Sequence, residues 1–400
     1  MTERQGMASQ QSGTVSKTKV LVAILAMCSI MMAYSAIMPI LSEVQKSFPE
    51  ASASSVQVVY SIAMLVSLPV MLASGVLTRW FSKKALTVFG SLLLALGFLP
   101  AFLHGSLIEL YVGSALVGAG SGIVNIISSA LISDYYDGVD KARVMGYQSA
   151  ALSLMGAVLA FASGQIAVMW QWWWSFLLFL VGIPVAAVIA VCLPKDKPVP
   201  QDAETTKATY SKGVIVWAIL AFVWSVFMYA FNTNIAMFIE SAGFGGADVA
   251  GGVTTMFSLI GLPAGFVVGA CVGALKRNVV PAACLLCAIG MVAIGLAPNI
   301  VVVYVGAFLF GLGFAIRNPC VVTFTAYIVP AAGVAAAIAL VQAAGTVAGF
   351  ISPFVVNFIA GFFGGDLRAT FVAVGILLGI ITVAYFLLNP VHNDDIEAAE

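Results

Sequence analysis

Charge is scarce in this chain of 400 residues. Aspartate, glutamate, lysine and arginine make up 8% of it, and the formal net charge is zero. Because a soluble globular chain of this length is about one quarter charged, a water-soluble protein is excluded. The balanced charge offers no basic surface, so no nucleic-acid partner is predicted. Histidine is nearly absent, since His104 and His392 are the only two and both lie outside the apolar runs.

The apolar runs also lack paired carboxylates and clusters of metal ligands. Glu109, Asp134 and Glu240 fall at the ends of these runs. Cys284 and Cys287 form a CxxC, but no histidine or acid accompanies them in the sequence. Small apolar filler is therefore favoured over metal or redox chemistry for these cysteines. The sequence predicts neither an enzyme nor a bound metal or cofactor.

In place of charged residues, the chain contains long apolar runs. Apolar residues make up 62% of it, and runs of about 20 residues are long enough to cross a bilayer as helices. We predict an all-α integral membrane protein with twelve transmembrane helices. The predicted spans are 20–41, 54–77, 85–103, 108–133, 144–168, 172–193, 214–239, 249–274, 279–297, 300–327, 334–360 and 369–389. The first is interpreted as a retained span, because no small-residue cleavage site follows it.

One long polar segment divides these spans six and six. The segment PKDKPVPQDAETTKATYSK is rich in proline and lysine and has no hydrophobic period, which is typical of a linker. The predicted organisation is an N-terminal tail, a six-helix bundle, a linker, a second six-helix bundle and a C-terminal tail. Their ranges are 1–19, 20–193, 194–213, 214–389 and 390–400.

The basic residues indicate the orientation. With both termini in the cytoplasm, 14 of the 17 lysines and arginines lie inside, as the positive-inside rule expects. Only Lys46 and Arg368 then lie outside, and Arg317 remains within the membrane. The WQWWW cluster at 170–174 falls at the outer surface, where indoles suit the lipid headgroups. We predict a multi-pass protein of the plasma (cell inner) membrane that is embedded in lipid as a monomer.

The two halves resemble each other at a nearly fixed offset, which is 193 residues in the first match below and 194 in the second. YVGSALVGAGSGIVN at 111–125 aligns with YVGAFLFGLGFAIRN at 304–318, and eight of the fifteen positions are identical. LPVMLASG at 68–75 matches LPAGFVVG at 262–269, and a basic pair follows each. The halves therefore form a parallel repeat about an axis along the membrane normal. The shared glycines predict close approach of helix backbones.

The segment GVLTRWFSKK, residues 75–84, resembles the signature between the second and third spans of the major facilitator superfamily. Gly75, Leu77, Lys83 and Lys84 match that signature, whereas Arg79 stands where the family usually has an acid. Residues 134–150 resemble the family's fourth loop. The resemblance implies two bundles that rock around a central site, lined by the first, fourth, seventh and tenth spans. The gating residues it implies, taken in both halves, are Gly75, Arg79, Lys83, Lys84, Gly269, Lys276 and Arg277.

Arg317 is the one charged residue between Asn299 and Val329. An arginine at a helix centre costs about 2.5–3.5 kcal/mol on insertion scales. It lies about 12 residues, roughly 18 Å, from the inner end of its span, which disfavours snorkelling. No acid within a span core is available for a structural ion pair, and the equivalent residue in the first half is Val124. A substrate-binding arginine is therefore favoured over a structural ion pair and over snorkelling.

A guanidinium is a fork of donors suited to carboxylate or phosphate. The predicted function is secondary active transport of a small organic anion by alternating access. Exchange is expected, because no membrane carboxylate neutralises the arginine of an empty carrier. Hydrogen bonding between helices is an equal alternative for each further candidate. The substrate-binding candidates besides Arg317 are Tyr34, Tyr60, Asn125, Tyr147, Gln148, Ser225, Tyr229, Asn232, Gln342 and Thr346.

Three other functions stay open. Proton-driven export of hydrophobic compounds would require a membrane carboxylate, and none is present in a span core. A neutral sugar or nucleoside would suit the asparagines. A transporter-like receptor would need an output domain, which the short tails and linker do not contain.

Overall fold

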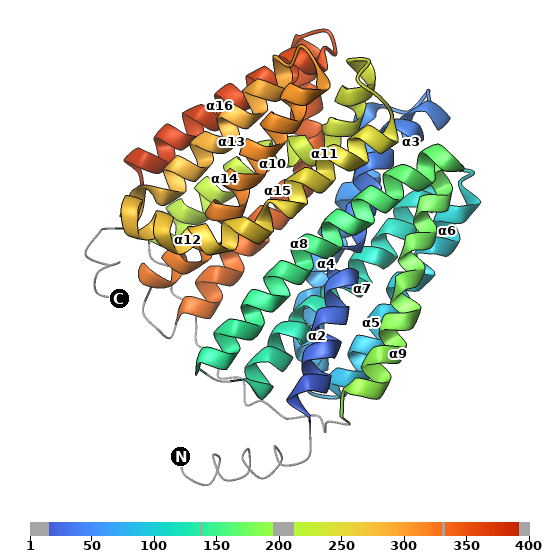
Figure 1. Ribbon diagram of the computed structural model, residues 1–400, viewed down its shortest axis with the longest axis vertical. Helices are drawn as coiled ribbons and strands as arrows, with labels where there is room; N and C mark the ends of the chain where they lie inside the picture. The colour runs from blue at the N-terminus through green and yellow to red at the C-terminus, as the bar shows by residue number, and fades with distance from the viewer. Residues whose placement is uncertain (1–15, 137, 195–211, 330–332, 392–400) are drawn as a thin grey trace.

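We describe a computed structural model of the chain, in which residues 16–136, 138–194, 212–329 and 333–391 are placed and form helices without strands. Eleven helices of this described part are long and apolar enough to cross a membrane. Figure 1 shows two bundles of long helices side by side, one from each half of the chain. The start of α2 and the end of α16 lie at the same end of the molecule, which we call the inner end.

The first half begins with a composite helix of α2 (Lys17–Met31), the 3-10 helix η1 (Ala33–Ile40) and α3 (Leu41–Ser47). Pro39 lies within η1 and cannot donate a backbone hydrogen bond there. The side chains of Ser52 and Ser82 accept hydrogen bonds from the first turns of α4 and α5. The remaining elements are α4 (Ala53–Leu77), α5 (Lys83–Leu96), α6 (Phe98–Leu103), α7 (Leu107–Tyr135), α8 (Gly138–Met169), η2 (Trp172–Val181) and α9 (Gly182–Cys192).

The second half repeats this order of spans. Its elements are α10 (Lys212–Ser241), α11 (Ala247–Leu259), α12 (Gly261–Leu275), η3 (Lys276–Asn278), α13 (Val279–Gly295), α14 (Ile300–Tyr327), α15 (Val334–Phe362) and α16 (Leu367–Leu387). The predicted eighth span consists of α11 and α12, which meet at Ile260. Every other predicted span coincides with one helix or with consecutive helices.

Buried apolar side chains gather in two clusters. The first is built from residues between 20 and 193, and the second from residues between 217 and 391. Tyr229 of α10 packs against both clusters, so it lies where the bundles meet. The exact domain boundaries remain a prediction. The predicted linker and both tails fall largely outside the described residues, at 195–211, 1–15 and 392–400.

Paired glycines give the repeat a structural basis. A methyl group built on Gly118 of α7 would lie 2.1 Å from the carbonyl oxygen of Ala63 on α4. In the second half, a methyl group on Gly311 of α14 would lie 2.9 Å from the carbonyl oxygen of Phe257 on α11. Residues 120 and 313 repeat the pattern against α5 and α13. The predicted close approach of helix backbones at these glycines is confirmed.

Candidate functional site

An amide network joins the two bundles in the outer half of the molecule. Gln57 of α4 donates through Nε2 to Asn234 Oδ1 of α10 over 2.8 Å. Asn357 of α15 donates through Nδ2 to Gln57 Oε1 over 2.8 Å and to Ser54 Oγ over 3.0 Å. Gln57 is fully buried and Asn234 is 1% exposed. We call these four residues, Ser54, Gln57, Asn234 and Asn357, the outer seal.

One helical turn further inward, the bundles meet mainly through aromatic side chains, together with the amide of Asn232. Asn232 donates through Nδ2 to the Tyr60 hydroxyl over 3.3 Å, and the Tyr60 ring meets Tyr34 edge-on with the centroids 5.8 Å apart. Tyr229 lies beside Gly349 of α15, where a built methyl group would come within 3.0 Å of its ring. The acceptor oxygen of Asn232 is buried without a partner. This cluster is where predicted candidates from both halves come together.

A second seam between the bundles runs along α8, α11 and α12. The hydroxyl of Thr255 donates to the carbonyl oxygen of Ala157 over 3.1 Å. A methyl group built on Gly164 would lie 2.4 Å from the carbonyl oxygen of Ala247, near the outer end. A methyl group on Gly261 would lie 2.4 Å from the Ser153 hydroxyl, near the middle of the membrane. The close contacts therefore extend from the outer end to mid-depth.

The inner halves of α4, α8 and α12 carry glycines that have no close neighbours. A methyl group built on Gly75, Gly146 or Gly269 would meet no atom within 4 Å. The side chains of Asn125 and Gln342 are exposed there, and Tyr147 is 49% exposed. Polar side chains at membrane depth face a water-accessible space and not lipid hydrocarbon. The structure is thus sealed towards the outer end and open towards the inner end.

Arg317 does not line this open space. It is 4% exposed, and its guanidinium carbon lies 3.6 Å from the centre of the Trp224 ring of α10. Its Nη2 donates to the Tyr385 hydroxyl of α16 over 2.6 Å. Its repeat partner Val124 is likewise fully buried in the first bundle. Position 317 therefore faces the interior of the second bundle.

The burial of Arg317 bears on the alternatives drawn from the sequence. Snorkelling to the membrane surface is wrong for this conformation. Within the described part of the chain the guanidinium pairs with no carboxylate, because its electrostatic neighbours are Tyr385, Cys284 and Cys287. Only carboxylates were considered from the sequence as partners of this charge, so Trp224 and Tyr385 were missed, although a cation is attracted to the face of an aromatic ring. We call Trp224 and Tyr385 the aromatic box.

Two buried N–H groups beside this charge have no hydrogen-bond partner among the described residues. They are Nε of Arg317 and Nε1 of Trp224. A buried donor without an acceptor costs about 1–3 kcal/mol. Because the guanidinium stacks on the indole, both donors belong to one small region of the bundle. The region is positively charged and has fewer acceptors than donors.

The other predicted site residues are dispersed. Gln148 donates to Ser128 Oγ over 2.8 Å within the first bundle, which is the helix-packing alternative. Thr346 donates to the Gln342 carbonyl one turn earlier in its own helix. Ser225 is buried, and a methyl group on Gly345 would come within 3.5 Å of its hydroxyl.

The predicted gating cations are engaged or exposed at the inner ends. Lys83 forms an ion pair with Asp134, and Lys84 donates to the carbonyl oxygen of Ala190 over 2.6 Å, both within the first bundle. Arg79 is exposed. In the second half the chain turns through positive φ at Lys276, and Asn389 donates to the Arg277 carbonyl over 2.9 Å. The predicted helix packing of Gly75 and Gly269 is absent in this conformation, because neither glycine has a close neighbour.

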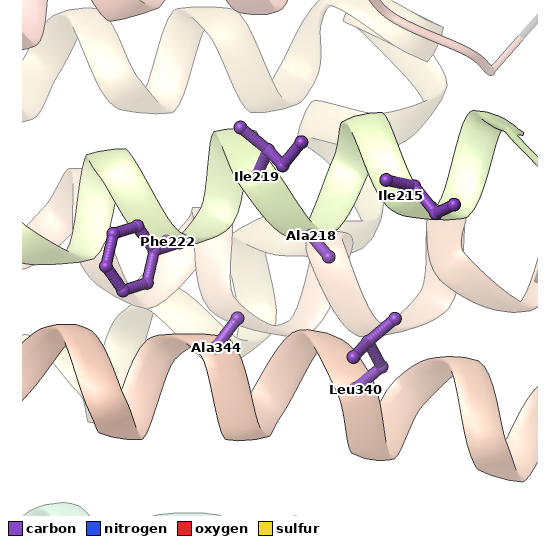
Figure 2. Close-up of a pocket in the computed structure, with 6 residues that line it drawn as sticks. All are labelled: Ile215, Ala218, Ile219, Phe222, Leu340 and Ala344. Atoms are coloured by element: carbon purple, nitrogen blue, oxygen red, sulfur yellow. The ribbon is translucent and has the colours of Figure 1, made fainter.

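An apolar groove of about 360 Å³ lies between α10 and α15, away from these residues. Figure 2 shows the six side chains that line it on the two neighbouring helices. They are Ile215, Ala218, Ile219, Phe222, Leu340 and Ala344. Without polar atoms the groove suits hydrocarbon and offers nothing to an anion.

A sequence model of the Major Facilitator Superfamily matches residues 23–275 and 244–400. The chain belongs to the major facilitator superfamily. It is therefore a multi-pass membrane transporter and not an enzyme. The resemblance seen at residues 75–84 is confirmed by a match over nearly the whole chain.

Solved transporter structures share the fold. The inward open conformation of the xylose transporter XylE from E. coli superimposes with a TM-score of 0.76 at 14% identity, covering 95% of this chain and 98% of that one. A mutant of the nucleoside transporter NupG gives a TM-score of 0.76 at 12% identity, covering 92% and 99%. A mutant of the peptide transporter POT in complex with sulfate gives 0.78 at 15%, covering 96% and 98%. At these identities the likeness concerns the fold.

A curated relative is the quinolone resistance protein NorB of Staphylococcus aureus (strain JH9). It is 25% identical over 167 residues, which are 42% of this chain and 35% of NorB. The chain thus matches about a third of the length of that relative.

Proposed function

We propose that this transporter carries a small organic anion of the carboxylate type by alternating access. The observation that carries the proposal is the buried charge of Arg317, which is surrounded by neutral groups within the described residues. An uncompensated buried cation costs several kcal/mol, whereas a cation paired with a bound anion is close to neutral. An anionic ligand therefore gains more from this bundle than a neutral one does.

The two unpartnered donors give the anion a specific place to bind. A carboxylate has two oxygens and accepts from both Arg317 Nε and Trp224 Nε1, which are the donors that lack acceptors. Hydrogen bonds from an ionised donor to a carboxylate are about twice as strong as neutral ones. Both atoms are buried in the inward-open state, so binding requires side-chain movement or a more closed conformation.

Tyr229 lies where the two bundles meet, because it packs against the buried clusters of both. Ser225, Tyr229 and Asn232 share one stripe of α10, at spacings of three and four residues. We propose that this stripe leads the anion from the open inner half to the arginine.

The proposal includes the mode and the setting of transport. Exchange of one anion for another is expected to be faster than net efflux, because the loaded site is electrically neutral. We further propose that the protein is a monomer of the plasma membrane with both termini in the cytoplasm, since 14 of the 17 basic residues then lie inside.

Export of hydrophobic compounds is the second candidate. The 25% identity with NorB favours it, and so does the neutral, aromatic character of Tyr34, Tyr60 and Tyr229. Against it, no carboxylate lies near Arg317 to carry a coupled proton within the described residues.

The deciding experiment is a thermal-shift screen of purified wild-type protein and of the Arg317→Gln variant. The ligands are small carboxylates, inorganic phosphate, neutral sugars, nucleosides and a hydrophobic quinolone. We expect carboxylates to stabilise the wild type and to lose that effect in the variant. Stabilisation by the quinolone or by a neutral ligand in both proteins would replace the anion proposal with the corresponding alternative.

A further inference from the structure

We propose that Trp224 and Tyr385 stabilise the charge of Arg317 while the site is empty, and that this allows the unloaded carrier to change orientation. In the empty carrier both act as positioning residues, through the arginine. The inference rests on the proposed function only in taking the loaded carrier to be the anion-bound one. Its test uses the empty protein and needs no substrate.

The geometry of the aromatic box is that of a cation site. The guanidinium carbon lies 3.6 Å from the centre of the Trp224 ring and 5.5 Å from the centre of the Tyr385 ring. The Tyr385 hydroxyl accepts from Nη2 over 2.6 Å. Trp224 is 1% exposed and Tyr385 is fully buried, so both interactions act in a desolvated environment. Cation–π attraction is strongest under those conditions.

The box itself is held by the second bundle. The Trp217 ring of α10 meets Tyr385 edge-on with the centroids 5.4 Å apart, and the Trp217 indole donates to the Val321 carbonyl over 3.3 Å. Phe314 of α14 stacks on Trp224 with the centroids 6.4 Å apart. These partners come from α10, α14 and α16, which belong to one bundle. The box therefore moves with that bundle as a unit and stays with Arg317 throughout the cycle.

This arrangement matters most in the occluded state. In the inward-open state water reaches the inner half of the molecule and would help to solvate an unboxed guanidinium. When both ends are closed, that water is excluded, and the aromatic faces are what remains to offset the charge. Loss of the Trp224 face should slow reorientation of the empty carrier about 30-fold, which corresponds to about 2 kcal/mol.

Single-molecule energy transfer in proteoliposomes measures this rate without a ligand. Dyes are attached at Asp140→Cys and Leu388→Cys, which lie at the inner ends of α8 and α16 in different bundles. Leu388 is 55% exposed and the Asp140 side chain is 59% exposed. The partly exposed cysteines are first removed as Cys192→Ser and Cys271→Ser, and the other four are buried.

Four variants decide the outcome. Trp224→Leu should lengthen the inward-open dwell time about 30-fold, and Tyr385→Phe, which removes only a hydroxyl, about five-fold. Adding Arg317→Gln to either variant should restore wild-type dwell times, because no charge then needs the box. Phe231→Leu is the matched control, since Phe231 is a fully buried ring of α10 that stacks on Phe310 and not on the arginine.

The double variants separate charge compensation from packing. If dwell times stay long after Arg317→Gln is added, the aromatic residues act through packing and the inference is overturned. Unchanged dwell times in Trp224→Leu and Tyr385→Phe would overturn it as well. Should Trp224→Leu fail to fold, the conservative Tyr385→Phe variant and its rescue carry the test alone. Failure of the anion screen would leave these dwell times unaffected, so the two proposals fail independently.

Discussion

The Nε2 atom of Gln57 lies 2.8 Å from Oδ1 of Asn234, and this hydrogen bond joins two helices that are 177 residues apart in the sequence. Its donor belongs to the first bundle and its acceptor to the second. Asn357 adds a bond to the same glutamine from α15. Opening the outer end must break these bonds, so their strength sets part of the balance between inward-open and outward-open states.

Replacement of this glutamine should open the outer end. Gln57→Leu removes the hydrogen bonds of Gln57 to Asn234 and Asn357, and leaves the buried Asn234 Oδ1 without this donor, whereas the Asn357–Ser54 bond remains. The inward-open state should lose about 2 kcal/mol, a shift of roughly 30-fold towards the outward-open state. Spin-label distances across the outer end measure the shift. Gln171→Leu, which removes an exposed amide at the outer end, is the control. An unchanged distance distribution in Gln57→Leu would mean that the amides do not hold the seal.

Arginine and lysine should differ at position 317. Arg317→Gln should insert normally and lose about 2–5 kcal/mol of anion binding, because one charge-assisted pair is removed. Arg317→Lys should recover only part, since an ammonium lacks the planar fork that both stacks on Trp224 and presents Nε. Titration of the best carboxylate from the thermal-shift screen gives the affinities. Equal affinity in all three proteins would remove Arg317 from the site.

Bulk at the open inner glycines should block closure. In the present conformation Gly75→Leu and Gly269→Leu meet no neighbouring atom within 4 Å of the first side-chain carbon. We expect both variants to fold and bind, and to transport at least tenfold more slowly if the inner halves of α4 and α12 must approach a partner helix. Gly379→Leu on α16 is the control, because Gly379 is equally uncrowded. Transport at the wild-type rate in saturating substrate would show that these glycines never become contacts.

Closely packed glycines should behave in the opposite way. Gly118→Ala places a methyl group 2.1 Å from the Ala63 carbonyl oxygen, whereas Gly146→Ala places it in open space. Overpacking costs about 1–3 kcal/mol, so the first variant should lower the thermal unfolding temperature and the second should not. A thermal denaturation series in detergent measures both. Equal melting temperatures would indicate that α4 and α7 shift apart without cost.

Apolar length and the internal repeat were readable from the sequence because each depends on one segment or on two aligned segments. The spans and the glycine contacts followed from them. The direction in which the Arg317 side chain points could not be read from the sequence, since it depends on the rotation of α14 within its bundle. A signal existed in Val124, because an apolar residue at the equivalent position indicates a buried face. Because Val124 indicates a buried face, Trp224 and Tyr385 could have been sought as buried partners of the Arg317 guanidinium.

The outer seal lay beyond sequence reasoning for a different reason. Gln57, Asn234 and Asn357 are ordinary polar residues within apolar spans, and each has many possible partners. Their pairing depends on which helices of opposite bundles are adjacent, and on how far the bundles have closed. Tyr229 and Asn232 were candidates because of their helical spacing on one span, and Tyr34 and Tyr60 because they are polar side chains within spans of the first half.

The outer seal consists of uncharged polar groups, and this affects how its closure depends on salt concentration and pH. An ion-pair closure would weaken in brine, where dissolved ions screen charges within about a nanometre, and in acid, where carboxylates are neutralised. The Lys46–Glu240 pair at the outer rim is open to both effects, since its side chains are 52% and 30% exposed. The amides neither titrate nor respond to screening. With the proposed orientation in the plasma membrane, the protein should therefore keep its outer face shut across wide changes of salinity and acidity outside the cell.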